Sequence, residues 1–146
     1  MVDRITAAQF KSRRKKPVDR EGPIQREIVT FLRKSMPFAI VHHAKGEINK
    51  SGAAIMREMA KAKLNGALPG FPDLIVMPYA NVGVLFFEVK AEGNYASKAQ
   101  KEMHENMRRL GYRVAVVRSV QDVRESLAEW GVGWIEEIPL RGEITG

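Results

Sequence analysis

The spacing of hydrophobic residues divides the chain into segments with helical and segments with extended character. Near the start, Ile24, Ile28 and Phe31 recur every three or four residues, and Pro23 suits the first turn of a helix that ends before Pro37. Further on, β-branched and aromatic runs alternate with turn-forming residues, which is typical of strands. In chain order the pattern predicts a helix over Gly22–Lys34, a strand over Phe38–His42, a helix over Ser51–Lys63, strands over Asp73–Met77 and Val84–Lys90, a helix over Ser97–Leu110, a strand over Arg113–Val117 and a last helix capped by Ser119.

The order of these elements predicts an α/β domain. The segment Pro78–Gly83 is rich in turn-forming residues, so the strands on either side of it should pair as an antiparallel hairpin. The helix over Ser97–Leu110 lies between two strands, and such a crossover predicts that these strands run parallel with a right-handed connection. We therefore expect a mixed central β-sheet flanked by helices.

The hairpin brings two acidic residues into register. If its turn is centred between Ala80 and Asn81, the numbers of facing residues have a constant sum, and Asp73 faces Glu88. Facing residues in an antiparallel pair have Cβ atoms about 4.5–5.5 Å apart. Two carboxylates at that separation repel each other, and Mg²⁺ compensates such pairs because it takes oxygen ligands from one or two carboxylates. The register therefore predicts a site for a divalent cation.

A lysine joins this pair on the same face of the strand. Strand periodicity places Lys90 on the face that carries Glu88. The residues of the opposite face are hydrophobic and suited to a core: Leu85, Phe87 and Val89. A lysine can position the attacking water or stabilise charge on a phosphate, and a divalent cation polarises the phosphate, which together are typical of phosphodiester hydrolysis. From the spacing alone, a charged stripe on a half-exposed strand is the favoured alternative.

Composition and charge narrow the class of protein. With 45% hydrophobic residues a core can form without staples, and the absence of cysteine excludes a disulfide framework, a zinc ribbon and a thiol nucleophile. The net charge is +7, and residues 1–20 contain seven basic and two acidic side chains. Such a basic arm suits phosphate binding, although a solvated tail has the same composition. We therefore expect a flexible basic arm over residues 1–18 and a single domain over residues 19–146.

Three blocks of sequence surround the charged residues of the hairpin. They are GFPDL at 70–74, EVK at 88–90 and SKAQ at 97–100, with a glycine at 93 in the loop before the last block. In type and order these blocks resemble the VRR-NUC family of the PD-(D/E)xK nucleases. EGPIQ at 21–25 is similar to the first helix of that family, and the likeness continues to about residue 125. The resemblance implies a restriction-endonuclease-like fold and favours a nuclease over a charged stripe.

The resemblance also implies a role for each residue of the hairpin site. Asp73 and Glu88 would bind Mg²⁺ or Mn²⁺ together with the main-chain carbonyl of Val89. Lys90 would be the catalytic lysine. Glu21 would support the metal from the first helix, either directly or through water.

Further residues would border this site. Gln25 lies one turn after Glu21 and would contact nucleic acid. Gln100 would hold substrate or water, although SKAQ is also the sequence of a helix capping box. If Gly22 is the N-cap of the first helix, Glu21 lies outside that helix, and Glu27 is its substitute.

Basic side chains outside the hairpin are candidates for contacts with the nucleic-acid backbone. Lys98 lies at a helix start beside the proposed site and is expected to contact phosphate. Arg57 and Lys61 belong to a basic cluster on the second helix, and the alternative for them is a solvated helix face.

Together these patterns predict a DNA endonuclease that depends on Mg²⁺ or Mn²⁺. Short members of the family resemble phage proteins associated with branched DNA such as four-way junctions, and a symmetric junction favours a homodimer. The alternatives are a non-catalytic nucleic-acid-binding module that keeps the fold, and a nuclease for RNA or linear DNA. The sequence shows no signal peptide and no membrane span, so we expect no membrane contact and a cytoplasmic location in a bacterial or phage-infected cell.

Overall fold

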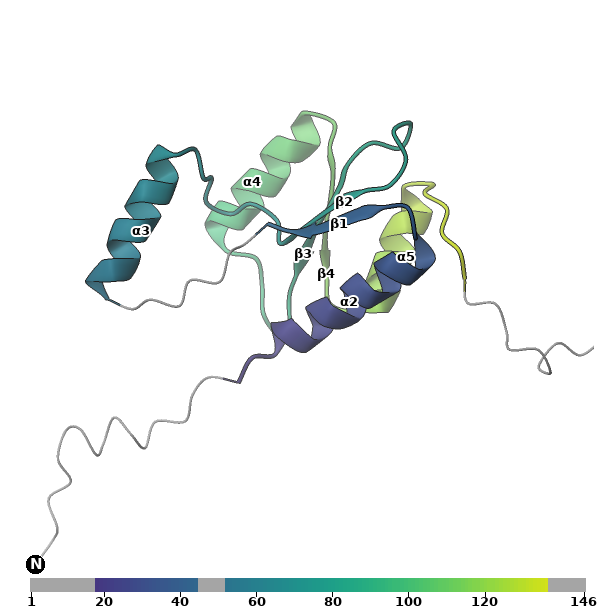
Figure 1. Ribbon diagram of the computed structural model, residues 1–146, viewed down its shortest axis with the longest axis horizontal. Coiled ribbons are helices and arrows are strands. Elements are labelled where there is room, and N and C mark those ends of the chain that lie inside the picture. The colour runs from purple at the N-terminus through teal and green to yellow at the C-terminus, as the bar shows by residue number, and fades with distance from the viewer. Residues whose placement is uncertain (1–17, 45–51, 137–146) are drawn as a thin grey trace, which may run out of the picture.

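A computed structural model of the protein describes residues 18–44 and 52–136. Within these ranges, helices and strands follow one another in the predicted order and with nearly the predicted bounds (Figure 1). They are α2 (Glu21–Ser35), β1 (Ile40–His43), α3 (Ala53–Leu64), β2 (Leu74–Met77), β3 (Leu85–Val89), α4 (Lys98–Arg109), β4 (Arg113–Val117) and α5 (Val120–Glu129). The basic arm expected over residues 1–18 lies outside the described residues except for Val18, and so does the end of the expected domain, residues 137–146.

The four strands of the described residues form one mixed sheet in the order β1-β2-β3-β4. β2 pairs antiparallel with both β1 and β3, whereas β3 and β4 pair parallel through the crossover helix α4. In the hairpin, Leu74 faces Phe87 and Val76 faces Leu85, which is the register predicted from the centre of the turn. The α/β class, the mixed sheet and the hairpin register are thus confirmed.

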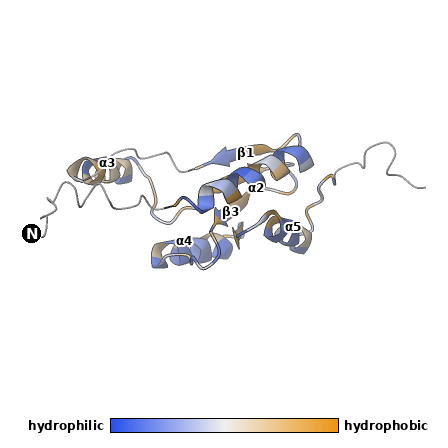
Figure 2. Cartoon of the chain, turned by 90° about the horizontal axis from the view of Figure 1, so that it is seen from below, coloured by the Kyte–Doolittle hydropathy of each residue, from blue (hydrophilic) through white to orange (hydrophobic). Residues whose placement is uncertain are grey.

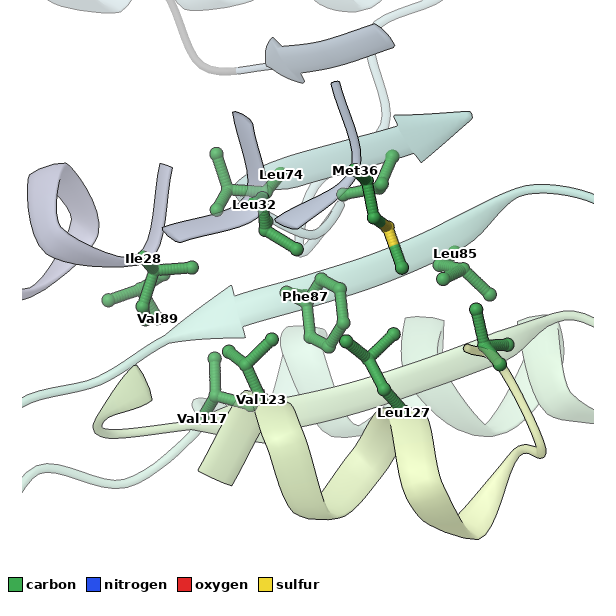
Figure 3. Close-up of a cluster of buried hydrophobic side chains, with 12 residues drawn as sticks. Ile28, Leu32, Met36, Leu74, Leu85, Phe87, Val89, Val117, Val123 and Leu127 are labelled. Atoms are coloured by element: carbon green, nitrogen blue, oxygen red, sulfur yellow. The ribbon is translucent and has the colours of Figure 1, made fainter. Parts of the chain in front are cut away.

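The main core lies between the sheet and helices α2 and α5. Alternate strand residues on this face are almost fully buried, with Phe87 in the middle of β3 (Figure 3). The Phe87 ring packs against the Trp130 indole with 5.5 Å between ring centroids. The buried members of the cluster are Ile28, Leu32, Met36, Leu74, Val76, Leu85, Phe87, Val89, Val117, Val123, Leu127 and Val132. Since burial of each large apolar side chain contributes about 1.5–3 kcal/mol, this cluster determines which face of β3 points inward.

Helix α4 covers the opposite face of the sheet. On this face Met107 of α4 forms a smaller buried cluster with Phe86 and Val114 of the sheet. The Phe86 ring meets Phe71 and Tyr112 edge to face, at centroid distances of 5.7 and 5.9 Å. Most of α4 is hydrophilic (Figure 2). The surface beneath α4 is therefore apolar near the start of β3 and becomes polar toward its end.

Helix α2 begins at Glu21 because a nearby aspartate replaces the missing side-chain cap. The Asp19 carboxylate accepts a hydrogen bond from the Gly22 N–H at 2.9 Å. Pro23 has no N–H that would need an acceptor. The N-cap is Arg20, so Glu21 belongs to the first turn, and the alternative in which Gly22 is the N-cap is wrong.

Helix α3 stands apart from the sheet. It has no buried residue and packs against no other described helix or strand (Figures 1 and 2). Arg57 and Lys61 on this helix are exposed. The predicted helix is confirmed from Ala53 onward, whereas its predicted start at Ser51 lies outside the described residues. No described helix, α3 included, has the length and apolar character needed to cross a membrane.

The segment after α5 returns to the end of α2. The Ile135 N–H donates a hydrogen bond to the Ser35 carbonyl at 2.9 Å. Trp134 packs against the main core from the same segment. This final segment therefore joins the ends of α2 and α5, a structural role that the sequence did not predict.

Candidate active site

Asp73 and Glu88 lie on neighbouring strands, on the face of the sheet that α4 covers. Asp73 directly precedes β2, and the hairpin register continued by one residue places it opposite Glu88. The Asp73 Oδ2 atom accepts a hydrogen bond from the Val89 N–H at 2.8 Å, which ties the two strands together at this level. Both acids are buried, with 7% of Asp73 and none of Glu88 exposed. The register that brings the two acids together is therefore confirmed.

Three side chains surround the Glu88 carboxylate. Gln100 Nε2 donates a hydrogen bond to Glu88 Oε1 at 2.8 Å, and Lys90 Nζ lies 3.8 Å from the same oxygen. His104 Nε2 lies 3.9 Å from Glu88 Oε2. A fully buried carboxylate has lost its hydration, which is strongly unfavourable unless polar groups replace the water. The Gln100 hydrogen bond and the Lys90 ammonium group compensate the burial of Glu88 at Oε1, and the His104 imidazole lies close to its other oxygen.

The Gln100 side chain uses both ends of its amide. Its Oε1 atom accepts a hydrogen bond from the Ser97 N–H at 2.8 Å, and Ser97 Oγ accepts one from the Gln100 N–H at 3.2 Å. The predicted capping box is therefore present at the start of α4. The other end of the same amide is the donor to Glu88. Gln100 thus caps the helix and borders the acid at the same time.

Gly70 allows the loop before β2 to approach the start of α4. Its φ of +80° lies in the left-handed region. A Cβ atom built on Gly70 would lie 2.7 Å from the Gln100 nitrogen and closer still to the Ala99 carbonyl oxygen. Only glycine permits both the positive φ and this close approach of two backbones. The glycine of the GFPDL block therefore lets the segment that carries Asp73 lie against the helical turn that carries Gln100.

Lys90 marks the side from which solvent reaches the cluster. Its N–H donates to the Val117 carbonyl at 3.0 Å, so pairing between β3 and β4 continues one residue beyond β3. The Lys90 side chain is 13% exposed, against 1% for that of Glu88. Glu88 is therefore covered, and the cluster reaches solvent mainly at Lys90.

The first turn of α2 packs against the loop between β3 and α4 (Figure 1). Arg20 Nη2 donates a hydrogen bond to the Glu92 carbonyl at 2.8 Å, and Asn94 Nδ2 donates to Glu21 Oε1 at 3.5 Å. Gln25 is half-buried one turn further along α2. The structure therefore places Glu21 beside the loop that leaves the site.

Glu27, the substitute considered for Glu21, lies on a different surface. It lines a groove of about 1040 Å³ between α2 and α5, together with Phe31, Arg124 and Trp134. Because α2 and α5 cover the main core, this groove is on the other side of the sheet from the two buried acids. Glu21 is thus the acid of α2 that comes to the edge of the site.

The basic residues expected to contact nucleic acid are spread over two regions. Lys98 begins α4 with 91% of its side chain exposed, and its Nζ lies 3.9 Å from Glu102 Oε1. Arg57 and Lys61 line a small hollow on α3, which does not pack against the sheet. Lys98 therefore lies at the start of the helix that carries Gln100, but its side chain extends into solvent, and Arg57 and Lys61 lie apart from the site.

His104 is a neighbour of the buried acid that the sequence did not predict. It is 2% exposed and approaches Glu88 from the second turn of α4. A signal was present, because His104 lies four residues after Gln100 and therefore on the same face of the helix. That spacing would have placed it beside Gln100, over the same region of the sheet.

The side chains of this site supply oxygen ligands of the type that Mg²⁺ and Mn²⁺ prefer. Within residues 18–44 and 52–136, no three histidine or acidic side chains come close enough to hold a metal by themselves. A cation here would therefore rely on Asp73, Glu88, the Val89 carbonyl and water. Mg²⁺ typically binds in this way, with one or two carboxylates and several retained waters. The residues present fit the expected metal.

The sequence is similar to a known family of nuclease domains. Residues 41–121 match the model of the VRR-NUC domain, and this range contains the blocks at 70–74, 88–90 and 97–100. Glu21 and Gln25 precede the matched range. A comparison with curated proteins found no match.

Two solved structures share the architecture described above. One is a VRR-NUC domain protein with 24% sequence identity and a TM-score of 0.58, and the alignment covers 82% of this chain and 100% of that chain. Another is a VRR-NUC domain with 26% identity and a TM-score of 0.52, and the alignment covers 77% of this chain and 97% of that chain. These similarities confirm the predicted fold class.

Proposed function

Because the chain belongs to the VRR-NUC family, a family of nuclease domains, we propose that it is a DNA endonuclease that depends on Mg²⁺ or Mn²⁺. One observation carries the proposal: Asp73 and Glu88 occupy facing positions of the hairpin, with Lys90 Nζ 3.8 Å from the Glu88 carboxylate. The alternative of an exposed charged stripe does not account for this arrangement, because Glu88 is fully buried and Gln100 binds it. Buried acidic side chains that contact other polar side chains are typical of functional sites.

Each residue of the site would have a separate role in phosphodiester hydrolysis. Asp73, Glu88 and the Val89 carbonyl would hold the cation, which supplies charge stabilisation to the phosphate when bound. The Val89 N–H and the Gln100 amide orient the two carboxylates, so that little rearrangement is needed when substrate arrives. Lys90 places an ammonium group at the open edge, where it stabilises negative charge on the phosphate or orients the attacking water.

The proposed polymeric substrate is consistent with the charge of the protein. The chain has a net charge of +7, and Lys98 is exposed at the start of α4. Lysine and arginine bind the phosphates of DNA by releasing its counterions. Gln25 on α2, and Arg57 and Lys61 on α3, would extend these contacts beyond the phosphate that is cut.

We further propose that the substrate is branched DNA, such as a four-way junction, and that two copies of the chain act together. A symmetric junction presents two equivalent strands, which suits a pair of active sites related by a twofold axis. On α3, Met56 and Met59 are 69% and 54% exposed, and a second copy would remove this apolar surface from water. Sedimentation of the protein, alone and with a junction, tests this part of the proposal, and monomers under both conditions would contradict it.

Labelled DNA substrates test the proposed activity. Duplex, single-stranded, flap and four-way-junction DNA are each incubated with the protein in Mg²⁺, Mn²⁺ or EDTA. We expect cutting in either metal, fastest on the junction, and none in EDTA. Asp73→Ala and Lys90→Ala should each lower the rate by at least about 10²-fold, because each removes a group that acts on the reacting phosphate. Lys101→Ala, in which an exposed lysine of α4 is removed, is the matched control and should cut normally.

The other outcomes of this experiment identify the alternatives. Circular dichroism and urea unfolding of each variant separate lost chemistry from a lost fold. Cleavage retained in both Asp73→Ala and Lys90→Ala would refute the site. Salt-sensitive DNA binding without product would identify a non-catalytic module, and cutting of RNA or of linear duplex alone would identify a nuclease of another class.

A further inference from the structure

Tyr95 is an exposed aromatic residue beside the proposed catalytic centre. It lies in the loop between β3 and α4, and 77% of its surface is exposed. The Arg118 guanidinium lies over its ring, 5.7 Å from the centroid. Exposed aromatic surface is unfavourable in water, so a ring held outward is a candidate for contact with another molecule.

Hydrogen bonds hold this loop in place. Gly93 adopts a φ of +81° within a turn in which the Asn94 N–H donates to the Ala91 carbonyl at 3.0 Å. Arg118 Nη2 donates to the Asn94 carbonyl at 2.7 Å. Arg20, from the start of α2, donates to another carbonyl of the loop at 2.8 Å. The loop is therefore bound to α2 and to the end of β4, and it presents the tyrosine from a fixed backbone.

Tyr95 and Arg118 are close to the catalytic residues in the chain and in the sheet. Arg118 follows Val117, whose carbonyl accepts the Lys90 N–H. Tyr95 lies between Lys90 and Ser97, the cap of the helix that binds the buried acid. A nucleic acid bound with one phosphate at Lys90 would therefore extend over this loop.

We propose that Tyr95 and Arg118 form a stacking platform for one unpaired base of the bound nucleic acid, next to the phosphate that is cut. The inference rests on the nuclease function proposed above and names a feature of its substrate. Unpaired bases expose their faces, and these stack on aromatic side chains with little dependence on sequence. The bases of an intact duplex are stacked on one another and do not present a free face to Tyr95.

Arg118 suits the same ligand in two ways. A guanidinium group can lie over an aromatic ring, as it does over Tyr95. It also binds phosphate oxygens through several N–H donors. The platform therefore selects nucleic acid that has an unpaired base beside the cut, such as a single-stranded end or the branch point of a branched molecule.

Binding in the absence of metal tests the platform separately from catalysis. The probes carry the fluorescent base 2-aminopurine, either in single-stranded DNA or paired within a duplex, and the protein is titrated into each in EDTA at one fixed salt concentration. We expect binding to quench the unpaired probe. Tyr95→Ala should bind the single-stranded probe about tenfold more weakly, because it loses one stacked base. Its affinity for the duplex should be unchanged.

Two variants serve as controls for this experiment. Tyr95→Phe keeps the ring and should bind both probes as the wild type does. Tyr79→Ala removes another exposed tyrosine, in the turn between β2 and β3, and should change neither affinity. Equal losses on both probes, or no loss in Tyr95→Ala, would overturn the platform. It would also be overturned if Tyr95→Ala altered self-association of the protein while DNA binding stayed the same.

The same oligonucleotides in Mg²⁺ distinguish this inference from the proposed function. If the wild type stacks the unpaired probe but cuts nothing, the platform stands and the nuclease proposal fails. If the wild type and Tyr95→Ala cut and bind equally well, the nuclease proposal stands and the platform fails.

Discussion

Among individual residues, Glu88 is the buried acid whose carboxylate is surrounded by three other polar side chains. Lys90 approaches its carboxylate from the same strand, whereas Gln100 and His104 approach from one face of α4. These neighbours are chemically different, since one is a neutral amide, one an ammonium group and one an imidazole. Their contributions can therefore be measured by separate substitutions, provided that coupling between them is taken into account.

Substitutions at Gln100 and Ser97 separate the cap of α4 from the contact with Glu88. Gln100→Ala removes both and should lower the free energy of unfolding by about 2–3 kcal/mol, because a buried acceptor loses its donor and a helix loses part of its cap. Ser97→Ala removes a cap acceptor only and should lower it by about 1 kcal/mol. Cleavage should fall in Gln100→Ala and persist in Ser97→Ala. Urea unfolding and cleavage rates measure the two effects, and equal loss of cleavage in both variants would contradict the separation.

The close approach at Gly70 leads to a second prediction at the residue scale. Gly70→Ala combines a positive φ with a clash against the first turn of α4, so we expect a loss of more than about 3 kcal/mol in unfolding free energy and a large drop in cleavage. Gly83→Ala is the matched control, because its φ is +82° and a Cβ there would meet no atom within 4 Å. It should lose only about 1 kcal/mol. Thermal and urea unfolding of both variants check this, and similar losses would show that the contact with α4 is unimportant.

At the scale of the elements, α4 links the packing of the domain to the site. Met107, near its C-terminal end, packs with Phe86 beneath the helix. Gln100 and His104, in its first two turns, contact Glu88 near the end of β3. The apolar contact at one end of the helix therefore helps to set the position of the polar contacts at the other.

The sequence predicted the hairpin well because register and burial constrain each other. A slip of one residue would turn Phe87 toward the face of α4 and Glu88 into the main core, so the hydrophobic alternation allows only one register. Asp73, Glu88 and Lys90 could for that reason be placed on one face. The four-residue spacing puts His104 on the same face of α4 as Gln100, but by itself it does not show that Glu88 is the strand residue beneath them both.

The spacing of hydrophobic and polar residues could not predict contacts between loops or the surroundings of α3. The approach of Gly70 to Ala99 and the position of Arg118 over Tyr95 join segments that lie far apart in the chain. Periodicity predicted helix α3 but not its separation from the sheet, since an amphipathic pattern does not specify what covers the apolar side.

For the whole molecule, the dominant feature of the sequence is the uneven distribution of positive charge. Residues 1–17 contain six basic residues and one acidic residue, and thus provide five of the seven net positive charges of the chain. We propose that this segment binds the DNA backbone, whereas the domain that follows it cleaves the phosphodiester bond. Such a division makes affinity, but not the cleavage step, sensitive to salt.

Deletion of residues 1–17 tests this division. We expect the plot of log affinity against log salt concentration to become less steep by up to about five units, because each phosphate contact contributes about 0.9 to the slope. The cleavage rate at saturating DNA should be unchanged. Deletion of residues 137–146, which contain two acidic residues and one basic residue, is the matched control. Equal slopes for the full chain and the variant without residues 1–17 would contradict a role for the segment in binding.

Because one Gln100 amide makes both hydrogen bonds, to Ser97 and to Glu88, the two bonds should break and re-form together. The ends of helices fray and re-form much more often than a whole domain unfolds. When the first turn of α4 frays, the side chain that leaves Ser97 also leaves Glu88, because both hydrogen bonds belong to one group. The Gln100–Glu88 hydrogen bond therefore cannot last longer than the first turn of α4 stays folded, even though the hydrophobic core unfolds much more rarely.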